Sequence, residues 1–119
     1  VIVHIDSEDH IHEHYGSAFH LKGWNIHTAR NGKDGIALVK QLKPHVIIMD
    51  LIISGLSGFE ILEMIKKDPE IAHIPVVIMS DLEHEDDIAR VHDFGIHKYF
   101  IKKECDRESV VMCIDLLRN

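Results

Sequence analysis

The sequence predicts an α/β fold built on a doubly wound parallel sheet, and three observations support this prediction. Short segments rich in β-branched residues recur along the chain, and segments of helical length with helical apolar spacing separate them. The short segments are almost continuously apolar, as in VIVHI at the start, which is typical of strands buried on both faces of a parallel sheet. The 119 residues suit a single domain, residues 1–119, with one hydrophobic core.

Five strands are expected, at residues 1–5, 25–29, 45–50, 74–80 and 98–101. Pro44 and Pro75 each stand at the beginning of a strand or just before it, where a missing backbone N–H costs little. The regular spacing of these segments leaves room for one helix after each strand.

Five helices are therefore expected, the first over residues 9–22. Ser57 and Glu60 form an S-x-x-E capping box before the third helix, and the acidic run 83–87 begins the fourth, where negative charge complements the helix dipole. Gly23 and Gly95 stand where left-handed helix ends belong. The apolar faces of the helices are Ile11, Tyr15, Ala18 and Phe19; Ile36, Leu38, Val39 and Leu42; Phe59, Leu62 and Ile65; Ile88, Val91 and His92; and Val110, Val111, Ile114 and Leu117. Met49, Met64 and Met79 are expected in the core, and Trp24 is expected to be partly packed.

This (βα)5 pattern predicts how the strands are ordered. Right-handed crossovers place helices on both faces of the sheet. For five strands the flavodoxin-like order 2-1-3-4-5 is the default, with its reversal between strands 1 and 3. Ligands in such folds bind beyond the carboxyl ends of the strands at that reversal.

Chemically capable residues follow four of the expected strands. Asp6 ends the first strand, Asp50 the third and Ser80 the fourth, and Lys102 follows the fifth. Any one of these residues alone is more often a solvated loop residue, but four of them at equivalent ends of four strands indicate a functional site. Two converging carboxylates repel unless a cation joins them, and Mg²⁺ is bound by carboxylates, water and phosphate. The chemistry indicated is a carboxylate nucleophile that receives a phosphoryl group.

The chain resembles the receiver domains of two-component response regulators (CheY-like) over nearly its whole length. The matching stretches are IDSED, VIIMDLIISGLSGFEIL, IPVVIMSD and GIHKYFIKK, in that order. The resemblance implies that Asp50 is the phosphoacceptor, that Asp6 and the backbone carbonyl of Ile52 contribute to a Mg²⁺ site, and that Lys102 binds the phosphoryl group. It also implies that Ser80 is the switch hydroxyl and Tyr99 the switch aromatic.

The same resemblance implies the partners. A histidine kinase or histidine phosphotransferase would donate the phosphoryl group, and a downstream protein target or a fused effector domain would respond. A receiver is a self-phosphorylating acceptor, so no enzyme turning over an external substrate is expected.

Three residues depart from the family pattern. Ser7 stands where a second acid usually contacts the metal, which makes it a weak or lost ligand position, with Glu8 and Asp81 as candidate substitutes. Asp81 itself replaces a small residue after the switch hydroxyl, and Lys103 replaces a proline. The alternative is thus a degenerate receiver, a protein-interaction module that takes no phosphate.

Composition limits the remaining functions. The net charge of −7 disfavours nucleic-acid binding, no apolar run is long enough for a membrane span, and two cysteines fit a reducing cytoplasm. A flavodoxin-type cofactor binder would need an amide-rich phosphate loop where the acidic IDSED stands. Of the eleven histidines, His10 and His14 have the i, i+4 spacing of a zinc or nickel pair, but surface histidines are the favoured interpretation.

Overall fold

The computed structural model describes residues 1–118 and contains five strands that alternate with five helices. In chain order the elements are β1 (Ile2–Ile5), α1 (Asp9–Leu21), β2 (Ile26–Ala29), α2 (Gly32–Leu42), β3 (Val46–Met49), α3 (Gly58–Lys67), β4 (Val76–Ser80), α4 (Glu85–Asp93), β5 (Lys98–Ile101) and α5 (Arg107–Asp115). The predicted alternation is confirmed, and the predicted strands extend beyond the observed ones by at most two residues at either end.

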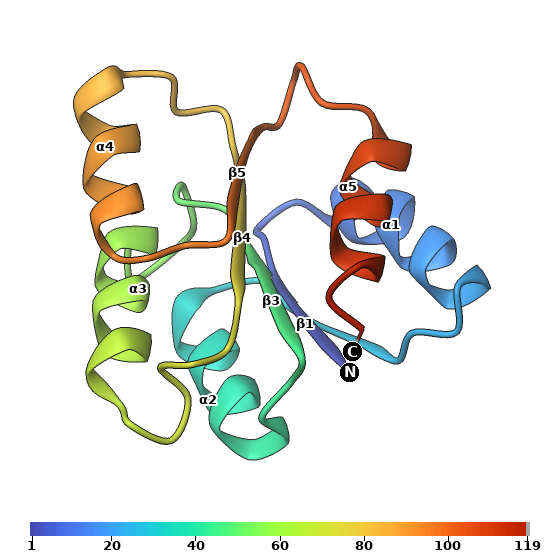
Figure 1. Cartoon of the computed structure of the whole chain (residues 1–119), viewed down its shortest axis with the longest axis horizontal. Coiled ribbons are helices and arrows are strands. Elements are labelled where there is room, and N and C mark those ends of the chain that lie inside the picture. The colour runs from blue at the N-terminus through green and yellow to red at the C-terminus, as the bar shows by residue number, and fades with distance from the viewer. Residues whose placement is uncertain (119) are drawn as a thin grey trace.

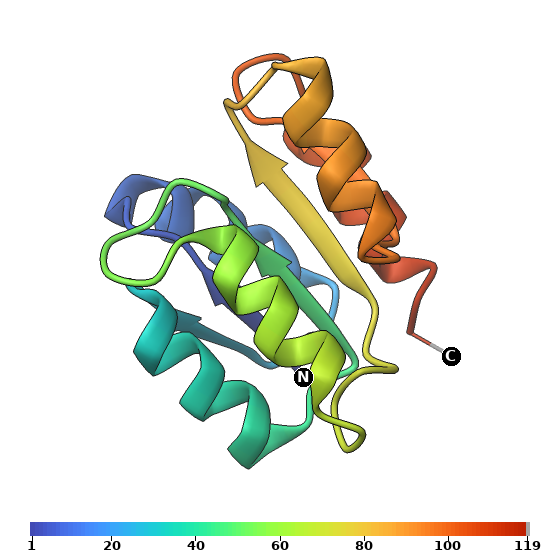
Figure 2. The ribbon, with the colours of Figure 1, turned by 90° about the vertical axis from the view of Figure 1, so that its left-hand side faces the viewer.

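All strands are parallel, and the sheet order is β2-β1-β3-β4-β5, as predicted. Helices α1 and α5 cover one face, while α2, α3 and α4 cover the other (Figure 1). Figure 2 shows these three helices in front of the twisted sheet. The reversal between β1 and β3 therefore lies at the centre of the sheet.

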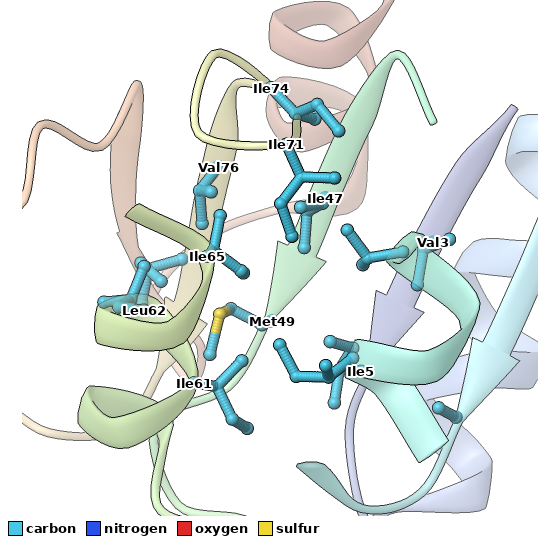
Figure 3. Close-up of a cluster of buried hydrophobic side chains, with 14 of the residues drawn as sticks. Val3, Ile5, Ile47, Met49, Ile61, Leu62, Ile65, Ile71, Ile74 and Val76 are labelled. Atoms are coloured by element: carbon cyan, nitrogen blue, oxygen red, sulfur yellow. The ribbon is translucent and has the colours of Figure 1, made fainter. Parts of the chain in front are cut away.

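Two apolar cores lie on the two faces of the sheet. The larger one packs β1, β3 and β4 against α2 and α3 through side chains such as Ile5, Met49 and Ile61 (Figure 3). The second packs the opposite face, including Ile48 and Met79, against Phe19 of α1 and Ile114 of α5. Burial on both faces explains why the strand sequences are continuously apolar rather than alternating.

Local signals behave largely as predicted. Gly23 and Gly95 have φ values of +83° and +81°, in the left-handed region. Ser57 accepts a hydrogen bond from the Glu60 N–H at 3.3 Å and caps α3. The Ser57 hydroxyl faces the Glu60 carboxylate at 3.5 Å, so that carboxylate does not complete the reciprocal half of the capping box.

Two packing predictions need correction. Met64 is 40% exposed and is not a core residue, because its position on α3 lies between the buried Ile61 and Ile65 and points away from the sheet. Trp24 is buried rather than partly packed, and its indole N–H donates to Asp115 at 3.0 Å. None of the helices within residues 1–118 has the length and apolarity that crossing a bilayer requires.

Candidate functional site

The register of the sheet brings the predicted site residues to one edge. Ile5 pairs with Met49, so Asp6 and Asp50 leave the sheet side by side at the ends of β1 and β3. Ser80 pairs with Ile101, and the next residue, Lys102, donates its backbone N–H to the Ser80 carbonyl at 2.9 Å. The four residues predicted from the strand ends therefore meet at the central reversal of the sheet.

The ammonium of Lys102 lies at the centre of this group. Its Nζ is 2.7 Å from Asp50 Oδ2 and 2.8 Å from Asp6 Oδ2. A third carboxylate, Glu8 Oε2, lies at 3.0 Å. The side chain of Lys102 is only 8% exposed and that of Asp6 only 1%, so these charges are largely shielded from water.

The carboxylates keep Lys102 charged. Burial lowers the pKa of the ammonium, but hydrogen bonds to Asp50, Asp6 and Glu8 outweigh burial and raise this pKa above its ordinary value. The lysine therefore carries its proton throughout the physiological range and neutralises part of the negative charge.

Backbone N–H groups orient both buried carboxylates. Asp6 Oδ1 accepts from the Glu8 N–H at 2.9 Å, and Asp50 Oδ1 accepts from the Ile52 N–H at 3.0 Å. Each aspartate is thereby held by one oxygen within its own loop, as in an Asx turn. The second oxygen of each is left to face Lys102.

The donor set fits a hard divalent cation. Three carboxylates face one ammonium, so negative charge remains in excess, and the charged partner of the buried Asp6 Oδ2 is Lys102 Nζ at 2.8 Å. Oxygen donors of this kind are those that Mg²⁺ prefers. As arranged in residues 1–118, no three His, Cys, Asp or Glu side chains are poised to hold a metal, since Lys102 Nζ lies where these three carboxylates converge.

Ser7 is engaged elsewhere. Its hydroxyl oxygen accepts a hydrogen bond from the Ser54 N–H at 3.2 Å. This contact joins the loop after β1 to the loop after β3, and a bridge between Asn31 and Ser54 extends it. Ser7 thus tethers two loops beside the carboxylates.

The two predicted switch residues meet the same loop residue. Ser80 is fully buried, and its hydroxyl oxygen accepts from the Leu82 N–H at 3.4 Å. The half-buried Tyr99 donates its hydroxyl to the Leu82 carbonyl at 2.7 Å, and burial raises the pKa of this phenol. A displacement of Leu82 would therefore change a hydrogen bond of both side chains.

Two of the residues that depart from the family pattern, Asp81 and Lys103, are hydrogen-bonded to each other. The Lys103 N–H donates to Asp81 Oδ1 at 2.9 Å. A proline at 103 would have no such N–H, so the acid at 81 and the non-proline at 103 form one contact between the loops after β4 and β5. Asp81 is thereby turned toward Lys103.

A double-mutant cycle tests this contact. We expect Asp81→Ala to lower the free energy of unfolding by about 1 kcal/mol, the value of a typical hydrogen bond. Lys103→Pro removes the same bond, so the two changes should be non-additive by a similar amount in urea unfolding. Lys103→Ala keeps the N–H and should add independently to Asp81→Ala. Full additivity in both cycles, within about 0.5 kcal/mol, would mean that the contact contributes nothing.

A buried histidine lies behind the acidic group and was not predicted. His4 of β1 is fully buried, and both ring nitrogens lack hydrogen-bond partners. Its ring lies 4.7 Å from that of His12, whose Nε2–H donates to the Asp6 carbonyl at 2.7 Å. Burial, followed by the charges of His12 and Lys102, lowers the pKa of His4 to about 3. The available signal was its place inside VIVHI, where its neighbours are core residues.

His10 and His14 lie exposed on α1. Within residues 1–118 they belong to no group of three ligands arranged for a metal. His10 Nε2 lies 3.9 Å from Glu8 Oε2, and both side chains are exposed. The i, i+4 pair thus remains a pair of surface histidines.

Comparisons with known proteins agree with this geometry. Residues 2–115 match the response regulator receiver domain family. The chain is 36% identical over 93 residues to protein PilH of Pseudomonas aeruginosa, covering 78% of this chain and 76% of PilH. It is 34% identical over 77 residues to the response regulator protein VraR of Staphylococcus saprophyticus, covering 65% of this chain but only 36% of that relative's length.

A solved structure shares the fold. The Mn²⁺-bound form of response regulator Rcp1 superposes with a TM-score of 0.83 at 20% identity, covering 97% of this chain and 89% of that one. The strand order agrees with this shared fold, and the match over residues 2–115 assigns the chain to its family. The protein belongs to the response regulator receiver domain family.

Proposed function

We propose that this receiver accepts a phosphoryl group on Asp50 from the phosphohistidine of a histidine kinase or histidine phosphotransferase. One observation carries the proposal: Asp50 directly follows the central strand β3, and its Oδ2 lies 2.7 Å from the buried ammonium of Lys102. A carboxylate is a competent nucleophile for phosphoryl transfer when nearby cations neutralise the charge that develops.

Each residue of the site has its own role in the proposed reaction. An Asp50 carboxylate oxygen attacks phosphorus, the P–N bond to the donor imidazole breaks, and an acyl phosphate forms. Lys102 neutralises charge on the phosphoryl oxygens. Asp6, Asp50 and the backbone carbonyl of Ile52 would hold Mg²⁺, which supplies further neutralisation of phosphoryl charge when bound. The acceptor is modified and no external substrate is turned over.

The switch would begin at Ser80. Its hydroxyl oxygen now accepts from the Leu82 N–H. Donation of that hydroxyl to a phosphoryl oxygen would draw the loop after β4 inward, and Tyr99 would follow through its bond to the Leu82 carbonyl. By resemblance to the family, the responding surface would lie on α4, β5 and α5, where a downstream protein or a fused effector domain would bind. The reaction is proposed to take place in the cytoplasm.

The decisive test of the proposal is a mass measurement. Incubation with Mg²⁺ and a small acyl phosphate, followed by intact mass spectrometry, should show a gain of one phosphoryl group per chain. Omitting Mg²⁺ and adding chelator should suppress the gain. No gain at any Mg²⁺ concentration would contradict the proposal.

A second candidate is the degenerate receiver, which binds partners without phosphorylation. The observation in its favour is Ser7, whose hydroxyl is bonded to Ser54 and provides no carboxylate. The same mass measurement separates the two candidates, because only the phosphoacceptor gains mass.

The phosphorylated form is expected to be long-lived. Hydrolysis needs a positioned water, and the flanking side chains of Ile52 and Leu82 are hydrocarbons that provide no hydrogen bond. After removal of the donor, intact mass followed over time should show slow loss of the phosphoryl group. Complete loss within seconds, without any phosphatase, would contradict this expectation.

A further inference from the structure

We propose that Glu8 supplies the acidic group that Ser7 does not, and so completes the Mg²⁺ site of the phosphoacceptor pocket. This inference rests on the proposed function, because it names a ligand of the same pocket. Its test reads metal binding directly and does not depend on phosphorylation.

The carboxylate of Glu8 already belongs to the buried charge cluster. Its Oε2 lies 3.0 Å from Lys102 Nζ, the same atom that contacts Asp6 and Asp50. The Glu8 side chain is 51% exposed, whereas Asp6 is almost fully buried. Glu8 therefore stands on the solvent-exposed side of the charge cluster, and Asp6 on its buried side.

Glu8 stands at the start of α1, yet its carboxylate does not cap that helix. Glu8 is the N-cap residue of α1, with extended backbone dihedrals of −99° and 116°, yet its side chain makes no cap hydrogen bond. An N-cap side-chain oxygen ordinarily accepts from the first turn of its helix. The carboxylate is instead directed across the loop to Lys102, 94 residues later.

The backbone of the loop supports that direction. The Glu8 N–H donates to Asp6 Oδ1 at 2.9 Å, which turns the chain back over the end of β1. Ser7, between them, is bonded to the Ser54 N–H. The loop therefore presents the residue after Ser7 to the pocket and uses Ser7 as a tether.

Charge identifies the ligand as a divalent cation. Asp6, Asp50 and Glu8 place three negative charges against the one positive charge of Lys102. Asp6 Oδ2 is buried and faces Lys102 Nζ at 2.8 Å. Glu8 Oε2 also lies 3.9 Å from Nε2 of the exposed His10, a surface contact that contributes little. A hard cation with oxygen preference satisfies this set.

The experiment compares Mg²⁺ binding by calorimetry and by the Mg²⁺-dependent rise in unfolding temperature. The wild type is compared with Glu8→Gln and with the matched control Glu13→Gln on the exposed side of α1. We expect Glu8→Gln to weaken Mg²⁺ binding about tenfold, the factor that about 1.4 kcal/mol represents. Glu13→Gln should bind Mg²⁺ as the wild type does.

Two further variants keep the inference falsifiable if Glu8→Gln folds poorly. Glu8→Asp keeps the charge but shortens its reach, and should fall between the wild type and Glu8→Gln. Ser7→Asp combined with Glu8→Gln should recover most of the lost affinity. Equal Mg²⁺ affinity of the wild type, Glu8→Gln and Glu8→Asp would overturn the inference.

Failure of the inference and failure of the proposed function have different signatures. If Glu8 variants bind Mg²⁺ normally while the wild type is phosphorylated by an acyl phosphate, only the role of Glu8 is wrong. If the wild type binds Mg²⁺ through Glu8 but gains no phosphoryl group, the ligand assignment stands and the phosphoacceptor function fails.

Discussion

Lys102→Met should lower the free energy of unfolding of the metal-free protein by about 3–5 kcal/mol, the cost of leaving buried charges without their partner. The ammonium lies within 3.0 Å of three carboxylates, and Asp6 and Lys102 are nearly buried. Methionine fills a similar volume but leaves Asp6 and Asp50 to repel each other. Urea unfolding in chelator measures the loss.

The same variant should respond more strongly to Mg²⁺ than the wild type. A divalent cation would then replace the missing positive charge, so added Mg²⁺ should recover part of the stability. Lys103→Met is the matched control, because the Lys103 side chain is 58% exposed and pairs with Glu83 on the surface, an interaction worth about 0–1 kcal/mol. Equal losses for Lys102→Met and Lys103→Met would contradict the central place of Lys102.

Acidification should destabilise the protein through His4. The folded-state pKa of this histidine is lowered to about 3 by burial and by the charges of His12 and Lys102, while an unfolded histidine titrates near about 6.5. Below the unfolded pKa, protons bind preferentially to the unfolded chain, so stability falls as the pH decreases from the unfolded toward the folded value. The free energy of unfolding is at its full value above the unfolded pKa of His4. Roughly 3–5 kcal/mol of it is lost once the pH has fallen to the folded pKa.

His4→Leu isolates this effect. The variant should unfold in urea with a shallower dependence on pH between neutral and acidic solution. At neutral pH it should be at least as stable as the wild type, because leucine removes two buried ring nitrogens that lack hydrogen-bond partners. His73→Gln, at an exposed position, should retain the wild-type pH profile. Parallel profiles for the wild type and His4→Leu would show that His4 is not the responsible group.

The fold was predictable because its signals are local and repeated. Strands buried on both faces must be continuously apolar, and the caps at Ser57, Gly23 and Gly95 mark helix ends through their own backbone requirements. Once five strands and five helices alternate, handedness leaves few possible orders. Met64 was misplaced because its residue type alone suggested the core, although it lies outside the helical face of Phe59, Leu62 and Ile65.

The outline of the site was also predictable, since residues at the ends of neighbouring parallel strands must converge. Its finer arrangement depends on where side chains turn. Asp81 turns to the Lys103 N–H, which no pattern within either loop reveals. Glu8 contacts Lys102 instead of capping its own helix, and His4 is buried among apolar neighbours. These contacts join residues that are far apart in the chain, or oppose the ordinary preference of the residue type.

The most direct test of the central claim, that Asp50 is the phosphoacceptor, compares three proteins under one phosphorylation reaction. The proteins are the wild type, Asp50→Asn and the control Asp93→Asn, which changes an exposed acid at the end of α4. Each is incubated with Mg²⁺ and a small acyl phosphate and then analysed by intact mass spectrometry. The account predicts one added phosphoryl group on the wild type and on Asp93→Asn, and none on Asp50→Asn. Undiminished phosphorylation of Asp50→Asn would contradict it.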